Sequence, residues 1–183
     1  MKRSLLTFAI ILAAGLSASP AAAQFGGRIS LMPYVGYGFL GSLPDTEAEL
    51  EADIAFGGRA AYQFSPQFAV FGNYQRTTPE VSIEDVGTGE EINLDHWSAG
   101  VEFSYVPRGG AEGMLPILLE AGLGQARFED GPSEIAANVG IASAIQLHPM
   151  FALRYGANDY IFNYNDQGMV NHIYVHVGAE VTF

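Results

Sequence analysis

The feature that most constrains this chain is an alternation of apolar residues with polar or small ones, which recurs in eight separate stretches and is broken at Phe71 in the third. The last stretch, HIYVHVGAEVTF at residues 172–183, alternates to its final residue and ends on an aromatic. Successive side chains of a β-strand point to opposite faces, so this period of two predicts strands with one apolar and one polar face. The predicted strands cover residues 28–40, 53–64, 67–77, 93–106, 115–128, 134–147, 150–162 and 172–183.

The connections between these stretches differ in length and character. Residues 65–67, 107–114 and 148–149 are short or marked by Pro and Gly. The other connections are mostly longer and more polar, at residues 41–52, 78–92, 129–133 and 163–171. An even number of antiparallel strands, with short turns at one rim and longer loops at the other, is typical of bacterial outer-membrane barrels. The strands are long enough, since a tilted membrane strand needs about 9–11 residues. The sequence therefore predicts an all-β fold, an eight-stranded antiparallel up-and-down transmembrane β-barrel.

The side chains on the two faces of the predicted strands differ in size, and this difference indicates which face contacts lipid. One face carries aliphatic residues in mid-strand and aromatic residues towards the ends, as in the aromatic girdles of membrane barrels. The opposite face is rich in glycine, at positions 36, 38, 57, 100, 122, 124, 140, 156 and 178. A soluble lipocalin-type barrel would turn its apolar face inward around a ligand. The small, polar face suits a narrow filled lumen better, so the membrane barrel is favoured over the soluble ligand carrier.

The N-terminal segment indicates export. A cationic start at Lys2 and Arg3, an apolar run over residues 5–16 and a small-residue stretch ending Ala21-Ala22-Ala23 are typical of a secretory signal peptide. We expect a signal peptide at residues 1–23, cleavage before Gln24 and one barrel domain at residues 24–183. Removing the signal leaves 6 basic and 20 acidic side chains and a net charge of −14, which argues against nucleic-acid binding. With no cysteine, stability must come from packing or from a membrane environment.

The signal peptide, the eight alternating strands and the ending Ala179-Glu180-Val181-Thr182-Phe183 resemble the small outer-membrane β-barrel superfamily, the group that holds the OmpA membrane domain and porin-like proteins. The resemblance covers essentially the whole mature chain, although it rests on patterns and not on invariant motifs. It implies localisation in the cell outer membrane, with both chain ends on the periplasmic side. It also implies that Phe183 is the terminal aromatic read as an assembly signal by the outer-membrane assembly machinery.

Charged residues on the small, polar face form the main candidate site. They are Arg59, Glu102, Glu120, Arg154 and Glu180. Four of them are expected in the periplasmic half of the lumen, with Arg59 nearer the middle. Arg154 and Glu180 lie on neighbouring strands and are expected to pair, whereas Glu102 and Glu120 face each other and need an arginine between them or a shared proton. We hypothesise a charged plug that blocks the lumen. Two alternatives to the plug remain: the charges merely neutralise one another, or they form a regulated gate.

Histidines provide a second set of candidates. His96-Trp97-Ser98 forms an H-x-S pattern like that of small barrels that deacylate lipid A, but both polar side chains fall on the predicted lumen face. No glutamate stands a dozen residues later, since the nearest is Glu112 in a turn. His96, His172 and His176 could together hold a metal, yet their strands are expected on opposite walls. The histidines are therefore interpreted as polar lumen groups, with no catalytic residue, metal or cofactor.

The predicted long loops are acidic, and no spacing in them matches an EF-hand. The acidic residues are Asp45, Glu47, Glu49, Glu51, Asp53, Glu80, Glu84, Asp85, Glu90 and Glu91. Solvation is the simplest interpretation, and cation bridging to surface lipid is the alternative. The sequence thus predicts a monomeric, non-enzymatic barrel with a structural or surface-interaction role, whose partners are outer-membrane lipid and lipopolysaccharide. The alternatives are a small channel for ions or hydrophobic solutes and a lipid A-modifying enzyme.

Overall fold

The computed structural model describes residues 27–44, 48–83, 86–106, 115–129, 131, 133–165 and 167–183. The predicted signal peptide at residues 1–23, the turn at residues 107–114 and Glu112 lie outside this part. Within it, no helix is long and apolar enough to cross a membrane.

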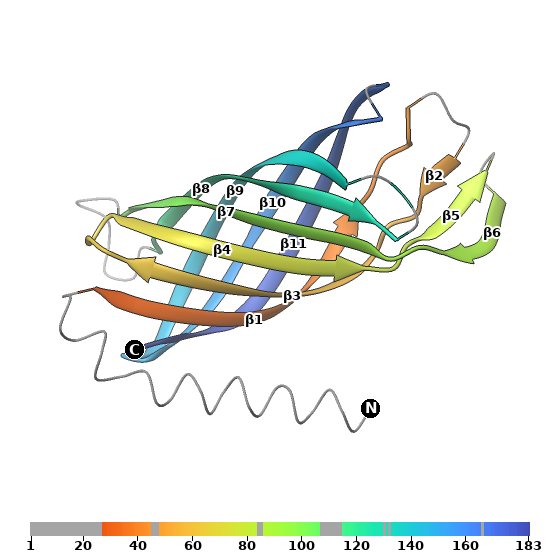
Figure 1. Ribbon diagram of the computed structural model, residues 1–183. Helices are drawn as coiled ribbons and strands as arrows, with labels where there is room; N and C mark the ends of the chain where they lie inside the picture. Colours follow the sequence, from red (N-terminus) through yellow and green to blue (C-terminus); the bar gives the residue numbers. More distant parts are fainter. Residues whose placement is uncertain are drawn as a thin grey trace.

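Eight antiparallel strands close into a barrel, each joined to its neighbours along the chain (Figure 1). Their order around the barrel is β1-β11-β10-β9-β8-β7-β4-β3, and β1 pairs with β11 to complete the ring. The strands are β1 (Arg28–Phe39), β3 (Asp53–Gln63), β4 (Phe68–Thr77), β7 (Leu94–Tyr105), β8 (Ile117–Phe128), β9 (Ser133–His148), β10 (Phe151–Tyr164) and β11 (Gly168–Thr182). The predicted fold class is confirmed, and closure leaves the barrel without a free edge.

The last strand is longer than its alternation predicts. It begins at Gly168, not at residue 172, because Gly168 and Met169 continue the ladder opposite Tyr164 and Asn163. At its other end, Phe183 N–H donates to the Ile29 carbonyl at 2.9 Å. The chain therefore ends on a strand because this strand closes the barrel against β1.

Two of the predicted loops contain additional strands, so their interpretation as plain loops is wrong. Strands β2 (Ala48–Leu50), β5 (Glu80–Ile83) and β6 (Val86–Glu91) form a separate antiparallel sheet in the order β2-β5-β6. The sheet projects from the end of the barrel opposite the C terminus (Figure 1). We call this end the sheet end and the other, where the chain terminates, the turn end.

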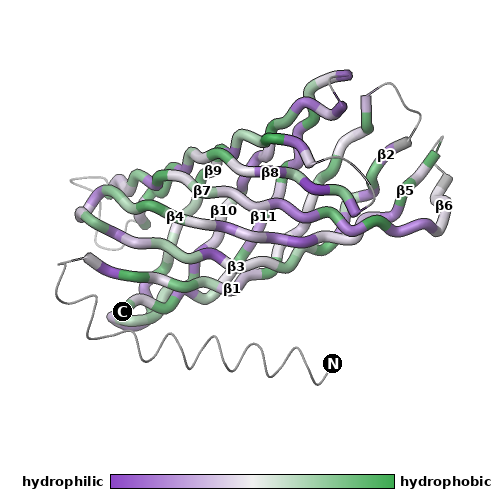
Figure 2. The backbone as a smooth tube through the Cα atoms, viewed as in Figure 1, coloured by the Kyte–Doolittle hydropathy of each residue, from purple (hydrophilic) through white to green (hydrophobic). Residues whose placement is uncertain are grey.

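The wall of the barrel separates an apolar outside from a mostly polar inside. Along each strand hydrophobic and hydrophilic residues alternate (Figure 2). Large apolar side chains on the outside are substantially exposed, for instance Phe56 at 66% and Leu123 at 68%. Such an exterior is unfavourable in water and favourable in a lipid bilayer. The predicted assignment of the two faces is confirmed.

The inside of the sheet end is apolar. Side chains of the barrel and of β2 form one buried cluster there, which we call the apolar cap: Leu40, Leu50, Ala55, Leu94, Ala126, Phe128, Ala136, Tyr160, Phe162, Val170 and Tyr174. Leu50 comes from the additional sheet and is only 4% exposed. The side chain of Leu50 thus packs into the sheet end of the barrel and anchors the small sheet there.

Candidate functional site

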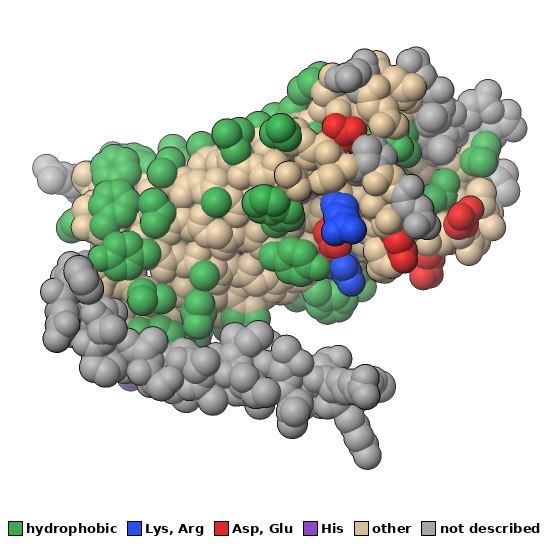
Figure 3. Space-filling model, in the orientation of Figure 1, with side chains coloured by type: hydrophobic (Ala, Val, Ile, Leu, Met, Phe, Trp, Pro, Cys, Tyr) green, Lys and Arg blue, Asp and Glu red, His purple; other side chains and the backbone are tan. Residues whose placement is uncertain are grey.

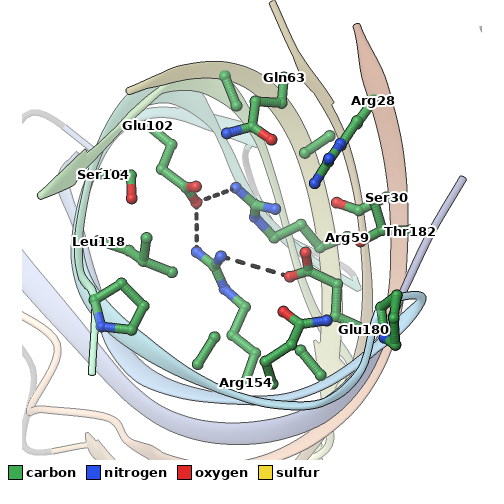
Figure 4. Close-up of a pocket in the computed structure, with 17 residues that line it drawn as sticks. Arg28, Ser30, Arg59, Gln63, Glu102, Ser104, Leu118, Arg154, Glu180 and Thr182 are labelled. Atoms are coloured by element: carbon green, nitrogen blue, oxygen red, sulfur yellow. Dashed lines mark hydrogen bonds and ion pairs between the residues drawn. The ribbon is translucent and has the colours of Figure 1, made fainter. Parts of the chain in front are cut away.

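The candidate site is the barrel interior, which opens at the turn end into a vestibule of about 440 Å³. Polar side chains line much of its wall, among them Arg28, Ser30 and Thr182 (Figure 4). The vestibule ends at the charged side chains of Arg59, Glu102 and Arg154, which project from the wall into the lumen. Charged side chains therefore form the inner end of this vestibule.

The structure brings together all five charged residues that the sequence singles out, and we call them the charge cluster. Glu102 Oε2 accepts from Arg59 Nη2 at 2.6 Å and from Arg154 Nη2 at 2.5 Å. Glu120 Oε1 lies 3.2 Å from Arg59 Nε and 2.5 Å from Arg154 Nη2. Glu180 Oε2 is 3.6 Å from Arg154 Nη1, so the pair expected from neighbouring strands is the longest contact of the cluster.

Two arginines compensate the negative charges of the facing carboxylates of Glu102 and Glu120. Glu102 and Glu120 are directly opposite in the β7–β8 ladder, and both arginines lie between their charges. Arg59 reaches them from β3, although the sequence placed it nearer the middle of the lumen. Arg154 and Arg59 are 2% and 6% exposed. Buried charges require this degree of pairing, because an unpaired ion inside a protein is strongly unfavourable.

Additional contacts hold the cluster in place. Asn158 Nδ2 donates to Glu120 Oε2 at 2.9 Å, which satisfies the second carboxylate oxygen. The Arg59 guanidinium carbon stands 4.9 Å from the ring centre of Phe71. Phe71 breaks the predicted alternation of its strand, and this cation–π contact gives the reason for an aromatic residue in a polar lumen.

A hydrogen-bonded layer fills the lumen between the charge cluster and the apolar cap. Tyr34 Oη donates to Asn73 Oδ1 at 2.9 Å, and Asn73 Nδ2 donates to Tyr160 Oη at 2.8 Å. Asn73 lies on β4 and Tyr160 on β10, which are diametrically opposite in the strand order. A direct hydrogen bond therefore crosses the lumen at this level and joins opposite walls.

The histidines correct one sequence-based inference. His96 on β7 and His172 on β11 are on opposite walls, as predicted, but this does not keep them apart. His96 Nε2 and His172 Nδ1 are 3.1 Å apart, and Tyr174 Oη lies 3.3 Å from His96 Nδ1. An eight-stranded barrel is so narrow that side chains from opposite strands meet at its axis. Among the described residues, no group of three His, Asp or Glu side chains is placed to hold a metal ion.

The H-x-S pattern does not assemble a lipid-facing catalytic set. His96 is fully buried and Ser98 is 2% exposed, both on the inside of the wall. Ser98 Oγ lies 3.5 Å from Tyr160 Oη, and His96 contacts His172 and Tyr174. Neither polar side chain reaches the outer surface where a lipid substrate would lie.

On the outside, an ion pair marks the border of the apolar belt at the sheet end. Arg76 donates through Nε and Nη2 to both carboxylate oxygens of Asp95, at 2.6 and 2.7 Å. Tyr74 Oη also donates to Asp95 Oδ1 at 2.8 Å. The hydrogen bonds from Arg76, and to a lesser extent that from Tyr74, hold the pKa of Asp95 below its usual range against the opposing effect of partial burial. Beyond this pair, Trp97 is the next outward side chain of β7, and it is 45% exposed.

The acidic loop residues that are described gather on and beside the additional sheet. Glu49, Glu51, Glu80, Glu90 and Glu91 belong to β2, β5, β6 or the residue after β2. Asp53 instead accepts from the Thr78 backbone N–H at 3.1 Å at the start of β3. Asp45, Glu47, Glu84 and Asp85 lie outside the described residues.

Together these features define a class of protein: a closed, eight-stranded antiparallel β-barrel with an apolar exterior and a filled, largely polar interior. No protein-family model matches the chain, and neither does any curated protein sequence. Solved structures do match over most of its length. Neisserial surface protein A aligns with a TM-score of 0.61 at 14% identity, covering 86% of this chain and 97% of that protein.

Two barrels from Pseudomonas aeruginosa match as well. The outer membrane protein OprG aligns with a TM-score of 0.56 at 11% identity, covering 86% of this chain and 95% of its own. The N-terminal β-barrel domain of OprF aligns with a TM-score of 0.52 at 15% identity, covering 86% and 99%. This chain thus has the fold of the small outer-membrane β-barrel superfamily, and the resemblance seen in its sequence is confirmed at the level of the fold.

Proposed function

We propose that this chain is a non-conducting barrel of the outer membrane with a structural or surface-interaction role. The observation that supports the proposal is that three sets of side chains follow one another along the lumen: the charge cluster, the hydrogen-bonded layer and the apolar cap. Water and ions need a continuous polar path, and an apolar constriction resists wetting. The turn end would face the periplasm and the acidic sheet the outside, as expected from the short turns and the long loops.

The shared fold supports this placement, since the matching proteins include a surface protein and an outer membrane protein. The apolar exterior supports it independently, because its exposed aliphatic and aromatic side chains suit a bilayer. His96 and Ser98 turn inward, so within the described part of the chain these two side chains form no catalytic set that lipid could reach. A non-enzymatic role therefore fits the geometry best.

The test is electrical conductance of the refolded protein in a planar lipid bilayer, with Arg154→Ala as the comparison. We expect the unmodified protein to show no steady conductance. Removing Arg154 leaves Glu102 and Glu120 with Arg59 alone, so we expect brief conducting events in the variant. A large, permanently open pore in the unmodified protein would contradict the plug and favour the alternative of a small channel.

A further inference from the structure

Basic side chains are scarce in this protein, and their placement is uneven. After the predicted signal peptide there is no lysine, and arginine stands at positions 28, 59, 76, 108, 127 and 154. Arg59 and Arg154 are used in the charge cluster, and Arg28 lines the vestibule at the turn end. Position 108 is outside the described residues. Arg76 and Arg127 are thus the described basic residues on the outer face of the sheet end.

These two arginines stand in one row across three neighbouring strands. Arg76 on β4 pairs in register with Asp95 on β7, and Asp95 pairs with Arg127 on β8. Adjacent strands are about 4.8 Å apart, so the two arginines are separated by roughly 10 Å of backbone. In Figure 3 blue basic side chains lie beside a red carboxylate where the green apolar side chains end.

The row carries a net positive charge. Asp95 occupies the Nε–Nη2 edge of Arg76, which leaves the Nη1 edge of that guanidinium free of this contact. The Arg127 side chain is exposed and makes no hydrogen bond or ion pair within the described part of the chain. Two arginines and one aspartate give a charge of +1, on a molecule whose other exposed charges at this end are mostly acidic.

An apolar groove in the outer wall begins directly beneath this row. Tyr74 and Trp97 border it on the side of the arginines, and the floor consists of small residues, among them Gly58, Gly72 and Ala99. A Cβ atom added at Gly58 or Gly72 would meet no heavy atom within 4 Å, so the wall is open at both positions. A row of cations, then two interfacial aromatic residues, then an apolar groove follows the order of groups along a charged lipid.

We infer that this sector of the wall is a binding site for a phosphorylated, multiply acylated lipid of the outer leaflet, of the lipid A class. Arg76 and Arg127 contact the phosphate, because a guanidinium matches the geometry of phosphate oxygens. One acyl chain lies along the groove over Gly58 and Gly72. Charge complementarity selects this occupant, since an uncharged lipid gains nothing from the arginines. The inference rests on the proposed outer-membrane placement.

The test measures which lipid stays on the purified protein. The barrel is refolded in detergent micelles, mixed with equal amounts of diphosphorylated lipid A, phosphate-free lipid A and phosphatidylglycerol, and purified again. Retained lipid is then quantified by mass spectrometry. We expect the unmodified protein to retain several-fold more diphosphorylated lipid A than either competitor. R127Q should lower that retention several-fold, and R76Q/R127Q should abolish the preference.

Two further variants separate the charge from the groove. Arg28→Gln removes one exposed arginine at the turn end, so it matches R127Q in charge and should retain lipid A like the unmodified protein. Gly72→Leu fills the groove without changing charge and should reduce retention of all acylated lipids there. Heat-modifiable gel migration verifies that each variant is folded.

Equal retention of the phosphorylated and phosphate-free lipids would overturn the inference. So would unchanged retention in R127Q, and so would equal retention of phosphatidylglycerol, which would indicate a general anionic surface. These outcomes leave the proposed function intact. Failure of the unmodified protein to form a heat-modifiable barrel in micelles would overturn both the proposed placement and the lipid site.

Discussion

At the scale of single residues, the charge cluster concentrates the strongest interactions of the lumen in a small space. One oxygen of Glu102 accepts from two arginines that arrive from β3 and β10. Glu120 accepts from Arg154 through Oε1 and from Asn158 through Oε2. Each partner is indispensable to the others, since removal of one charge leaves its counterpart buried and uncompensated.

This dependence predicts that Arg154→Met is strongly destabilising although it keeps the side chain long. Loss of one partner of a buried pair costs about 3–5 kcal/mol. The measurement is the free energy of unfolding by urea in lipid vesicles. Arg76→Met is the matched control, because its ion pair with Asp95 is largely exposed and such pairs contribute about 1 kcal/mol or less. Similar losses in the two variants would contradict the importance assigned to burial.

The Arg76–Asp95 pair predicts a small dependence of stability on pH. Because the pKa of Asp95 is lower in the folded state, the pair stabilises the fold above about pH 4, the ordinary aspartate value. This contribution is lost as the pH falls through the lower folded-state pKa. We expect the difference in unfolding free energy between the unmodified protein and Arg76→Gln to be at most about 1 kcal/mol at pH 7 and smaller at pH 2. A difference that grows on acidification would contradict this account.

Two adjacent glycines of β3 give a further test at single positions. A Cβ at Gly57 would come within 2.3 Å of Tyr34 Cζ, and the Tyr34 hydroxyl is fixed by Asn73 and Gln75. Gly57→Ala should therefore destabilise the barrel by about 1–3 kcal/mol, as overpacking does. Gly58→Ala points outward into open space and should be neutral or slightly stabilising. Thermal unfolding of both variants in the same detergent distinguishes them.

At the scale of the elements, the sequence predicts the barrel strands well because each has one face in lipid and one in the lumen. The period of two is imposed on both faces at once, and the boundaries of β1, β3 and β4 agree with their predictions to within a residue. Strands β2, β5 and β6 were not predicted because they are short, at three, four and six residues. Val86-Gly87-Thr88-Gly89-Glu90-Glu91, for example, has neither alternation nor bulk.

The candidate site was predictable in its members but not in all of its contacts. Charges on the inward face identify the five residues of the cluster, since an isolated charge cannot stay in a narrow lumen. His96 and His172 are 76 residues apart in the chain. Their contact depends on how far strands β7 and β11 are shifted relative to each other along the barrel axis. This shift follows from the stagger of the strands in the closed barrel, and the alternation within a single strand does not encode the stagger.

The attachment of the additional sheet through Leu50 gives a prediction at this scale. Leu50→Ala removes a buried side chain from the apolar cap, so the β2-β5-β6 sheet should open more often. A protease that cleaves after glutamate reports this opening, because Glu49 and Glu51 flank the position. We expect several-fold faster cleavage near β2 than in the unmodified protein. Ile83→Ala, on the same sheet but 46% exposed, should leave the rate unchanged.

At the scale of the whole molecule, the two ends of the barrel differ in what they can bind. The turn end holds a polar vestibule above the charge cluster, whereas the sheet end is closed by the apolar cap and carries acidic strands. The belt between them is apolar on all sides, with the Arg76–Asp95–Arg127 row at one border. The proposed function therefore predicts that partners bind on the surface of the barrel and do not pass through it.

The closing strand provides the last prediction, since Phe183 is proposed as an assembly signal as well as a neighbour of β1. If Phe183 is read during assembly, Phe183→Ser should lower the amount of barrel found in the outer-membrane fraction of cells several-fold. Its unfolding free energy after refolding in vitro should change little, because the backbone pairing with Ile29 remains. Phe151→Ser is the matched control: Phe151 is an outward aromatic at the same end, opposite Val181 in the ladder. Equal cellular levels for the two variants would show that Phe183 contributes only membrane contact, and a large loss of stability in vitro would attribute its effect to folding.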